Sequence, residues 1–132
     1  MLAINLWQCN SIDVKAAFLQ GSQLDRDVYL KPPKEVNDSV GKLWKLKKCV
    51  YGLKDGSRVW YFTVKSTLLR LGCIQLKVDP AMFYWFHNNK LCGLFVMHVD
   101  DFIWGGTPEF EISIIDKIRS KFEIRKTIYF SF

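Results

Sequence analysis

Apolar positions along the chain fall into short blocks that glycine, proline or paired acidic residues separate. Short apolar or alternating runs predict strands. These runs are residues 9–14, 28–30, 43–46, 82–86, 91–99, 102–104 and 128–132. Residues 16–20 predict a short helix that Gly21 ends. The pattern therefore mixes strands with helices and contains no internal repeat.

Two longer segments carry apolar residues at helical spacing. Ser57 is a candidate N-cap for a helix that runs to Leu71, and Gly72 follows its end. Thr107 is the candidate cap of the second helix, with Pro108 at its first position. The apolar stripe of the second helix consists of Phe110, Ile114, Ile115, Ile118 and Phe122.

Two hairpins are expected between these helices. The runs 82–86 and 91–99 are joined by His-Asn-Asn-Lys, and asparagine tolerates the positive φ of a tight turn. The runs 94–99 and 102–104 flank an Asp100-Asp101 turn. Consecutive hairpins with interspersed helices indicate an α+β domain, an antiparallel sheet backed by helices.

Composition narrows the class of protein. The 132 residues suit one small domain, and 49% hydrophobic residues exclude a disordered chain. No apolar run has the length of a membrane span, and the first residues lack the features of a signal peptide. The four cysteines have no zinc-site spacing. We therefore expect reduced thiols, a cytoplasmic or nuclear location and no membrane partner.

The positive charge is concentrated in one part of the chain. The net charge is +6, and residues 42–70 contain eight basic residues against one acid. Aromatic residues interleave with them, which is typical of a nucleic-acid groove in which cations meet phosphates and rings stack on bases. A solvated basic face with core aromatics is the alternative interpretation.

Two adjacent acids, Asp100 and Asp101, stand between strongly apolar runs. A solvated hairpin tip would explain them, because aspartate is common in turns. Adjacent carboxylates repel, however, unless a cation lies between them. A third acid, Asp13, ends another strand-like run. Three carboxylates on strand ends are a candidate site for two Mg²⁺ ions, which prefer oxygen ligands.

Motifs spread over the whole chain resemble the reverse transcriptases of copia-type (Ty/copia) LTR retrotransposons. Their order and spacing match that family. The matching segments are SIDVKAAFLQG at 11–21, VYLKPP at 28–33, LWKLKKCVYGLK at 43–54, SRVWY at 57–61, DPAMF at 79–83 and HVDDF at 98–102.

The resemblance implies a reverse-transcriptase palm whose Asp-Asp hairpin is catalytic. Asp13 and Asp100 would bind two Mg²⁺ ions, or Mn²⁺ in their place, with help from the backbone carbonyl of Val14. Asp101 would be the second acid of the hairpin, with a weaker hold on metal. The reaction would be attack of a primer 3′ hydroxyl on the α-phosphate of a deoxynucleotide.

The resemblance also assigns a nucleotide site. The backbone around Lys15, Ala16 and Ala17 would meet the triphosphate. Phe18 matches the family's sugar gate, where a flat ring would clash with a 2′ hydroxyl. An ordinary core phenylalanine is the alternative interpretation of Phe18.

Template and primer contacts follow from the same match. Lys54 and Arg58 would lie along the template and the nascent base pair. His98 stands where reverse transcriptases commonly have a tyrosine that touches the primer. The partners would be an RNA or DNA template-primer and deoxynucleotides.

The resemblance makes residues 1–132 one partial reverse transcriptase domain. Fingers are expected upstream, and thumb and RNase H downstream, in the remainder of a Pol polyprotein. A catalytically silent relic or nucleic-acid-binding module is the alternative function. A nucleotidyl cyclase also places acids on a hairpin but would lack the flanking motifs.

Overall fold

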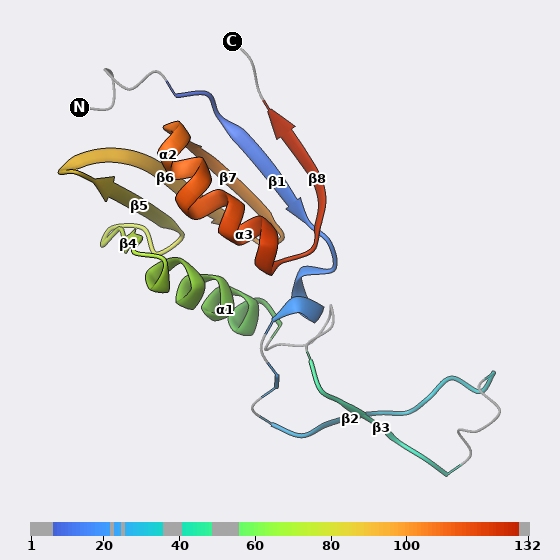
Figure 1. Cartoon of the computed structure of the whole chain (residues 1–132). Coiled ribbons are helices and arrows are strands. Elements are labelled where there is room, and N and C mark those ends of the chain that lie inside the picture. Colours follow the sequence, from blue (N-terminus) through green and yellow to red (C-terminus); the bar gives the residue numbers. More distant parts are fainter. Residues whose placement is uncertain (1–6, 22, 25, 36–40, 49–55, 130–132) are drawn as a thin grey trace.

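A computed structural model describes residues 7–21, 23–24, 26–35, 41–48 and 56–129. Its main sheet is built of β1 (Asn10–Val14), β4 (Ile74–Gln75), β5 (Met82–His87), β6 (Lys90–His98), β7 (Asp101–Gly106) and β8 (Ile124–Tyr129). The spatial order is β4-β5-β6-β7-β1-β8, and every pairing is antiparallel. The N-terminal strand β1 is therefore inserted between two strands from the C-terminal half (Figure 1).

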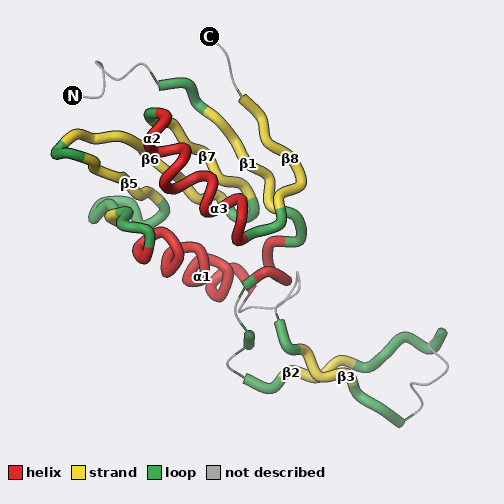
Figure 2. The backbone as a smooth tube through the Cα atoms, in the orientation of Figure 1, coloured by secondary structure: helices red, strands yellow, loops and turns green. Residues whose placement is uncertain are grey.

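Helices cover one face of this sheet (Figures 1 and 2). The first is α1 (Gly56–Arg70), and the second runs without a break through α2 (Pro108–Phe110), the π-helical η4 (Glu111–Ile115) and α3 (Asp116–Lys121). The Thr107 hydroxyl accepts a hydrogen bond from the Phe110 amide at 3.3 Å, which caps the second helix. The expected sheet backed by helices is thus present.

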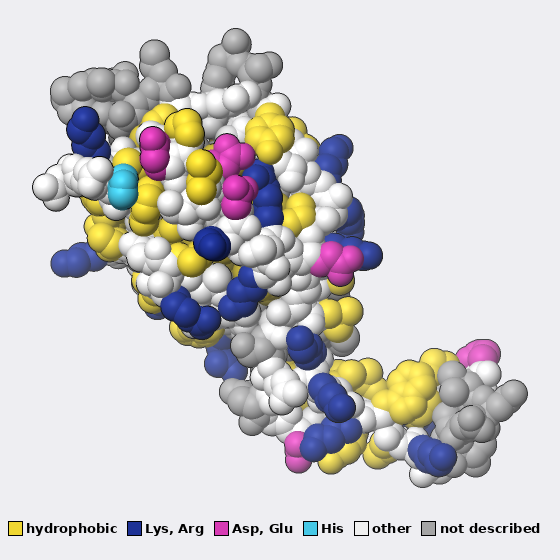
Figure 3. All heavy atoms as spheres, viewed as in Figure 1, with side chains coloured by type: hydrophobic (Ala, Val, Ile, Leu, Met, Phe, Trp, Pro, Cys, Tyr) yellow, Lys and Arg dark blue, Asp and Glu magenta, His cyan; other side chains and the backbone are white. Residues whose placement is uncertain are grey.

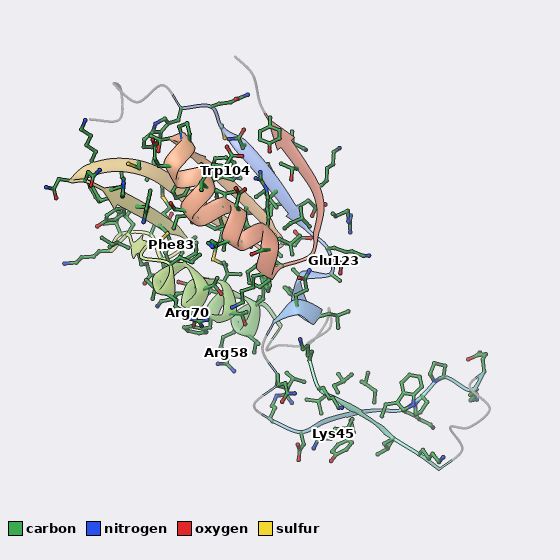
Figure 4. All side chains as sticks on the ribbon, in the orientation of Figure 1. Lys45, Arg58, Arg70, Phe83, Trp104 and Glu123 are labelled. Atoms are coloured by element: carbon green, nitrogen blue, oxygen red, sulfur yellow. The ribbon has the colours of Figure 1, made fainter. Side chains whose placement is uncertain are left out.

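The core fills the space between the sheet and the two helices. Phe83 and Trp104 lie in this layer (Figure 4). Gly93 lets the second helix approach the sheet closely, because a Cβ there would lie 2.2 Å from the ring of Phe110. The largest fully buried side chains are Trp60, Phe83, Phe95, Phe102 and Phe110.

A separate two-stranded ribbon projects away from the sheet (Figure 1). It pairs β2 (Val28–Leu30) with β3 (Trp44–Leu46), and Leu30 lies opposite Trp44. A short 3₁₀ helix, η2 (Ala17–Gln20), precedes the ribbon and follows β1. About half of the Trp44 side chain is exposed, since none of the described helices or strands forms a second layer over the ribbon.

Most predicted elements occur at the predicted places, with four corrections. Ser57 is not an N-cap, because α1 already begins at Gly56 and Ser57 lies within the helix. Asp101 is already the first residue of β7, so the second turn falls at Val99 and Asp100 rather than at the acid pair. The last strand begins at Ile124 rather than at residue 128, because buried Phe122 ends the helix and only one residue links it to the strand. The first long helix ends at Arg70, one residue before the predicted Leu71.

The remaining sequence expectations concern thiols and membranes. Cys9, Cys73 and Cys92 are free thiols, and Cys49 lies outside the described residues. Burial raises the pKa of the Cys73 thiol to about 12, so this group is unreactive at neutral pH. Among the described helices, none has the length and apolar character needed to span a bilayer.

Candidate metal and nucleic-acid site

Three carboxylates meet at one end of the sheet. Asp13 is the next-to-last residue of β1 and lies directly opposite Asp101 of β7, and Asp101 lies opposite His98 of β6. Asp100 occupies the turn between β6 and β7. One carboxylate oxygen of each acid lies within 4.8 Å of the other two, and all three residues are partly buried. The acids that the sequence singled out therefore form one cluster, and His98 adjoins it.

A backbone hydrogen bond ties two of the acid-bearing segments together. The amide of Val14 donates a hydrogen bond to the carbonyl of Asp100 at 2.9 Å. Val14 itself is almost completely buried, and the pairing of β1 with β8 shifts register between Asp13 and Val14. The irregularity breaks the regular alternation of side chains where β1 ends. It is thus a local feature of the acid-bearing strand end.

The electrostatics of the cluster favour a bound cation or proton. Burial, followed by the charges of Asp100 and Asp13, raises the pKa of the Asp101 carboxyl above its ordinary value. A hydrogen bond with Asp13 raises this pKa further, whereas nearby His98 lowers it. Asp101 consequently holds a proton more tightly than an isolated aspartate.

One cation already lies beside the cluster, on a residue that the sequence did not single out. Arg125 Nη1 lies 3.6 Å from Asp13 Oδ2, and the Arg125 side chain is 67% exposed. Arg125 belongs to β8, which pairs with β1, but the predicted strand started after it. Arg125 lies next to the acids because β8 begins at Ile124, four residues earlier than predicted.

Lys15 follows the cluster and is tied to the turn that precedes β8. Its amide donates to the carbonyl of Glu123 at 2.9 Å, and its ammonium lies 3.1 Å from the Glu123 carboxylate. The Gln20 side chain donates to the backbone carbonyls of Lys15 and Glu123 and accepts from the Glu123 amide. Figure 4 marks Glu123 beside this junction. The sequence predicted only that Gln20 lies in a short helix. Its hydrogen bonds to Glu123 could not be predicted, because Glu123 is distant in the chain.

The other residues of the predicted nucleotide site differ in exposure. Ala16 adopts a left-handed conformation, with φ of 45°. Ala17 is fully buried, and Phe18 is 8% exposed within the core cluster. Phe18 thus packs as a core residue, and its role as a sugar gate stays a prediction.

The predicted template residues lie on another surface. Arg58 projects from the first turn of α1, on the side away from the sheet (Figure 4), and Lys54 lies outside the described residues. Arg58, Arg70 and Lys121 line a cavity of about 380 Å³ on the outer face of α1. Hydroxyl groups of Thr63 and Ser66 complete its polar lining; among the described residues around it, none is acidic.

The basic segment of the sequence is divided between two structures. Residues 42–48 contain β3 and the residues on either side of it, whereas residues 58–70 lie in α1. Lys and Arg side chains gather over both regions on the face shown in Figure 3. Lys45 pairs with Asp27 at 3.1 Å across the ribbon, which raises the pKa of the Lys45 ammonium. The two surfaces together form a broad basic side of the molecule.

Comparison with known proteins gives a consistent result. A family model described as reverse transcriptase (RNA-dependent DNA polymerase) matches residues 1–131. The chain is 31% identical over 121 residues to the retrovirus-related Pol polyprotein from transposon RE1 of Arabidopsis thaliana, which covers 90% of the chain and 8% of that polyprotein.

A second relative is the transposon Ty1-MR1 Gag-Pol polyprotein of Saccharomyces cerevisiae, which is 35% identical over 125 residues. That match covers 92% of the chain and 7% of the polyprotein. The chain therefore spans less than a tenth of the length of these copia-type relatives. No solved structure matches the chain at a significant level.

Proposed function

The chain belongs to the reverse transcriptase (RNA-dependent DNA polymerase) family of copia-type Pol polyproteins, and we propose that it carries the palm active site of such an enzyme. The proposed reaction joins a primer 3′ hydroxyl to the α-phosphate of a deoxynucleotide and releases pyrophosphate. One observation carries this proposal: Asp13, Asp100 and Asp101 bring carboxylate oxygens within 4.8 Å of one another.

The donor set of the cluster fits a hard divalent cation. Three carboxylates supply only oxygen atoms, which Mg²⁺ and Mn²⁺ accept as ligands. Burial, followed by the charges of Asp100 and Asp13, raises the pKa of Asp101, so the cluster favours an added positive charge. The proposed ligands are Asp13 and Asp100, with Asp101 and the carbonyl of Val14 as weaker ones.

In this proposal the cations would activate the reacting groups, and the residues of the chain would hold the cations in place. When bound, such ions lower the pKa of an attacking hydroxyl and neutralise charge on the leaving group. Asp13 and Asp100 would hold that positive charge at a fixed place. No protein nucleophile is required for this reaction.

We place the nucleotide beside residues 15–18. Support comes from chain order, because these residues directly follow the first acid of the cluster, and from the exposed Lys15 ammonium, which can reach an anionic group. In this proposal the backbone of Lys15, Ala16 and Ala17 faces the triphosphate, and Phe18 lies beneath the sugar. The bracing of Lys15 by Gln20 and Glu123 would keep this backbone in place.

We place the template-primer along His98 and the basic side of the molecule. His98 is exposed and lies opposite Asp101, where it could donate a hydrogen bond to a primer. Arg58 and Lys54 are proposed template contacts, and the basic cavity beside Arg58 offers further cations for phosphates. The fingers, thumb and RNase H portions would come from the remainder of a Pol polyprotein.

Two consecutive assays, metal binding and then primer extension, test the proposal. The chain is titrated with Mn²⁺ and then assayed for deoxynucleotide incorporation on an RNA template. Asp100→Asn should lose both signals, whereas Asp116→Asn, at an exposed acid of α3, should keep the Mn²⁺ signal. Template-primer binding without Mn²⁺ binding would refute the catalytic proposal and favour a silent nucleic-acid-binding module.

A further inference from the structure

Trp60 links helix α1 to the turn that carries Asp100. The Trp60 side chain is 1% exposed, and its indole Nε1 donates a hydrogen bond to the carbonyl of Val99 at 2.6 Å. Its ring stacks on Phe102 at 6.0 Å and meets Phe122 edge-on at 5.0 Å. The indole is therefore held by the core on its faces and presents its one polar atom to the turn.

The turn that receives this hydrogen bond is strained. Val99 has φ of 51°, a left-handed conformation that a β-branched residue rarely adopts. The Val99 side chain is 52% exposed, so its own burial does not hold this conformation. Such strain persists only where the surroundings enforce it.

Two donors from outside the turn bond to its backbone, one on each side of Asp100. The carbonyl of Val99 belongs to the peptide before Asp100 and accepts from Trp60. The carbonyl of Asp100 belongs to the peptide after it and accepts from the amide of Val14. With both flanking peptide planes fixed, the direction in which the Asp100 side chain leaves the backbone is fixed as well.

We propose that Trp60 is a positioning residue whose indole N–H keeps the left-handed Val99 turn in the conformation that presents Asp100 to the metal. This inference rests on the proposed metal-binding function and adds a residue to it. Trp60 need not touch metal, nucleotide or primer, because it acts through the backbone of Val99.

A packing role alone would not require an indole at this position. The ring contacts with Phe102 and Phe122 would be largely available to a phenylalanine, whereas only the indole supplies the N–H. Trp104 provides the contrast within the same core. It is 3% exposed, and its Nε1 has no hydrogen-bond partner among the described residues.

The pair of tryptophans gives a matched experiment in the full chain. Trp60→Phe and Trp104→Phe make the same change in volume, but only the first removes the hydrogen bond to the turn. We expect Trp60→Phe to weaken Mn²⁺ binding by about 3- to 10-fold, the factor corresponding to one net hydrogen bond. Trp104→Phe should leave Mn²⁺ affinity within about 2-fold of the unchanged chain, because it removes no such bond.

A rescue variant separates positioning from packing. Glycine adopts positive φ at little cost, so Val99→Gly should remove the strain that Trp60 counteracts. In the Val99→Gly background, Trp60→Phe should therefore cost less Mn²⁺ affinity than in the unchanged chain. Equal losses in both backgrounds, or equal losses from Trp60→Phe and Trp104→Phe, would overturn the positioning role.

An NMR measurement keeps this inference separate from the metal proposal. The amide resonances of Val99 and Asp100 should shift or broaden in metal-free Trp60→Phe and stay unchanged in Trp104→Phe. If these resonances stay unchanged in both variants, the hydrogen bond does not order the turn and the inference fails. Failure of the unchanged chain to bind Mn²⁺ would instead contradict the proposed function.

Discussion

The backbone amide of Val14 donates a hydrogen bond to the carbonyl of Asp100 at 2.9 Å. Val14 directly follows Asp13, so this bond connects the backbone next to one acid with the backbone of another. This bond joins the end of β1 to the β6–β7 turn through main-chain atoms alone. A carboxylate can consequently be replaced by an amide without breaking the connection that brings Asp13 and Asp100 together.

Asp13→Asn should therefore remove metal affinity while leaving the fold intact. The carboxamide keeps the shape of the side chain but loses the charge that attracts a divalent cation. We expect Mn²⁺ affinity, measured by calorimetry, to fall by at least about 10-fold, since a charge-assisted contact at a partly buried site is lost. Far-ultraviolet circular dichroism should be unchanged, and a collapsed spectrum would show that the carboxylate is needed for folding.

The stability of the metal-free chain should decrease as pH rises above 3.8, the ordinary pKa of Asp101. The folded state raises this pKa through burial and the charges of Asp100 and Asp13, so it binds the proton more tightly than the unfolded state. That contribution is complete at acidic pH and is lost as pH rises through the folded-state pKa.

Asp101→Asn tests this linkage. The variant should unfold a few degrees higher than the unchanged chain at neutral pH without metal, because one of three repelling charges is gone. Its thermal midpoint should also depend less on pH above 3.8. A midpoint below that of the unchanged chain at neutral pH would mean that ionised Asp101 is stabilising.

The acid cluster was predictable from the sequence because each acid adjoins an apolar run that had to become a strand. The position of the turn was not, since Asp-Asp suits a turn by composition while Val99 does not. The left-handed Val99 depends on donors from Trp60 and Val14, which are distant in the chain. Local propensity gives no sign of such partners.

Arg125→Gln should strengthen Mn²⁺ binding at low ionic strength. Arg125 Nη1 lies 3.6 Å from Asp13 Oδ2 and competes with a metal for that carboxylate. Because Arg125 is well exposed, we expect a gain of only about 2- to 5-fold. The gain should shrink as salt is added, and Arg26→Gln, at an exposed residue before the ribbon, serves as the control.

Arg70→Gln should weaken nucleic-acid binding equally for all sequences. Arg70 lines the basic cavity on α1, where it would meet phosphates rather than bases. The slope of log affinity against log salt for single-stranded RNA should decrease in magnitude by about 0.7. Lys117 is an exposed residue of α3 that does not line the cavity, so Lys117→Gln should leave that slope unchanged. Equal effects of both variants would contradict a local binding site at the cavity.

Gly93→Ala should destabilise the fold by about 1–3 kcal/mol, the usual cost of overpacking a core. The added Cβ would lie 2.2 Å from the ring of Phe110, which would have to move away from the sheet. Urea unfolding gives the change in free energy. Gly21→Ala is the control, because its nearest neighbour would be 3.4 Å away and its φ of −68° suits alanine.

For the basic segment, composition predicted the charge but not the arrangement of the residues in space. Its charge and aromatic content are evident from the sequence, but its division between the ribbon and α1 depends on the fold. Trp60 belongs to the core and Trp44 to an exposed ribbon, although both lie in the same basic, aromatic stretch. Burial of an aromatic residue is decided by whether a second layer covers it, and none of the described helices or strands covers the ribbon.

The insertion of β1 between β7 and β8 imposes an order of events on folding. The hairpins β5–β6 and β6–β7 join neighbouring segments and can form early, whereas β1 must wait for partners from the opposite end of the chain. On the ribosome, Asp13 emerges long before Asp100 and Asp101, and the three meet only when this late pairing is made. Acquisition of metal affinity would therefore mark the completion of folding, and its rate should follow the slowest step in the assembly of the sheet.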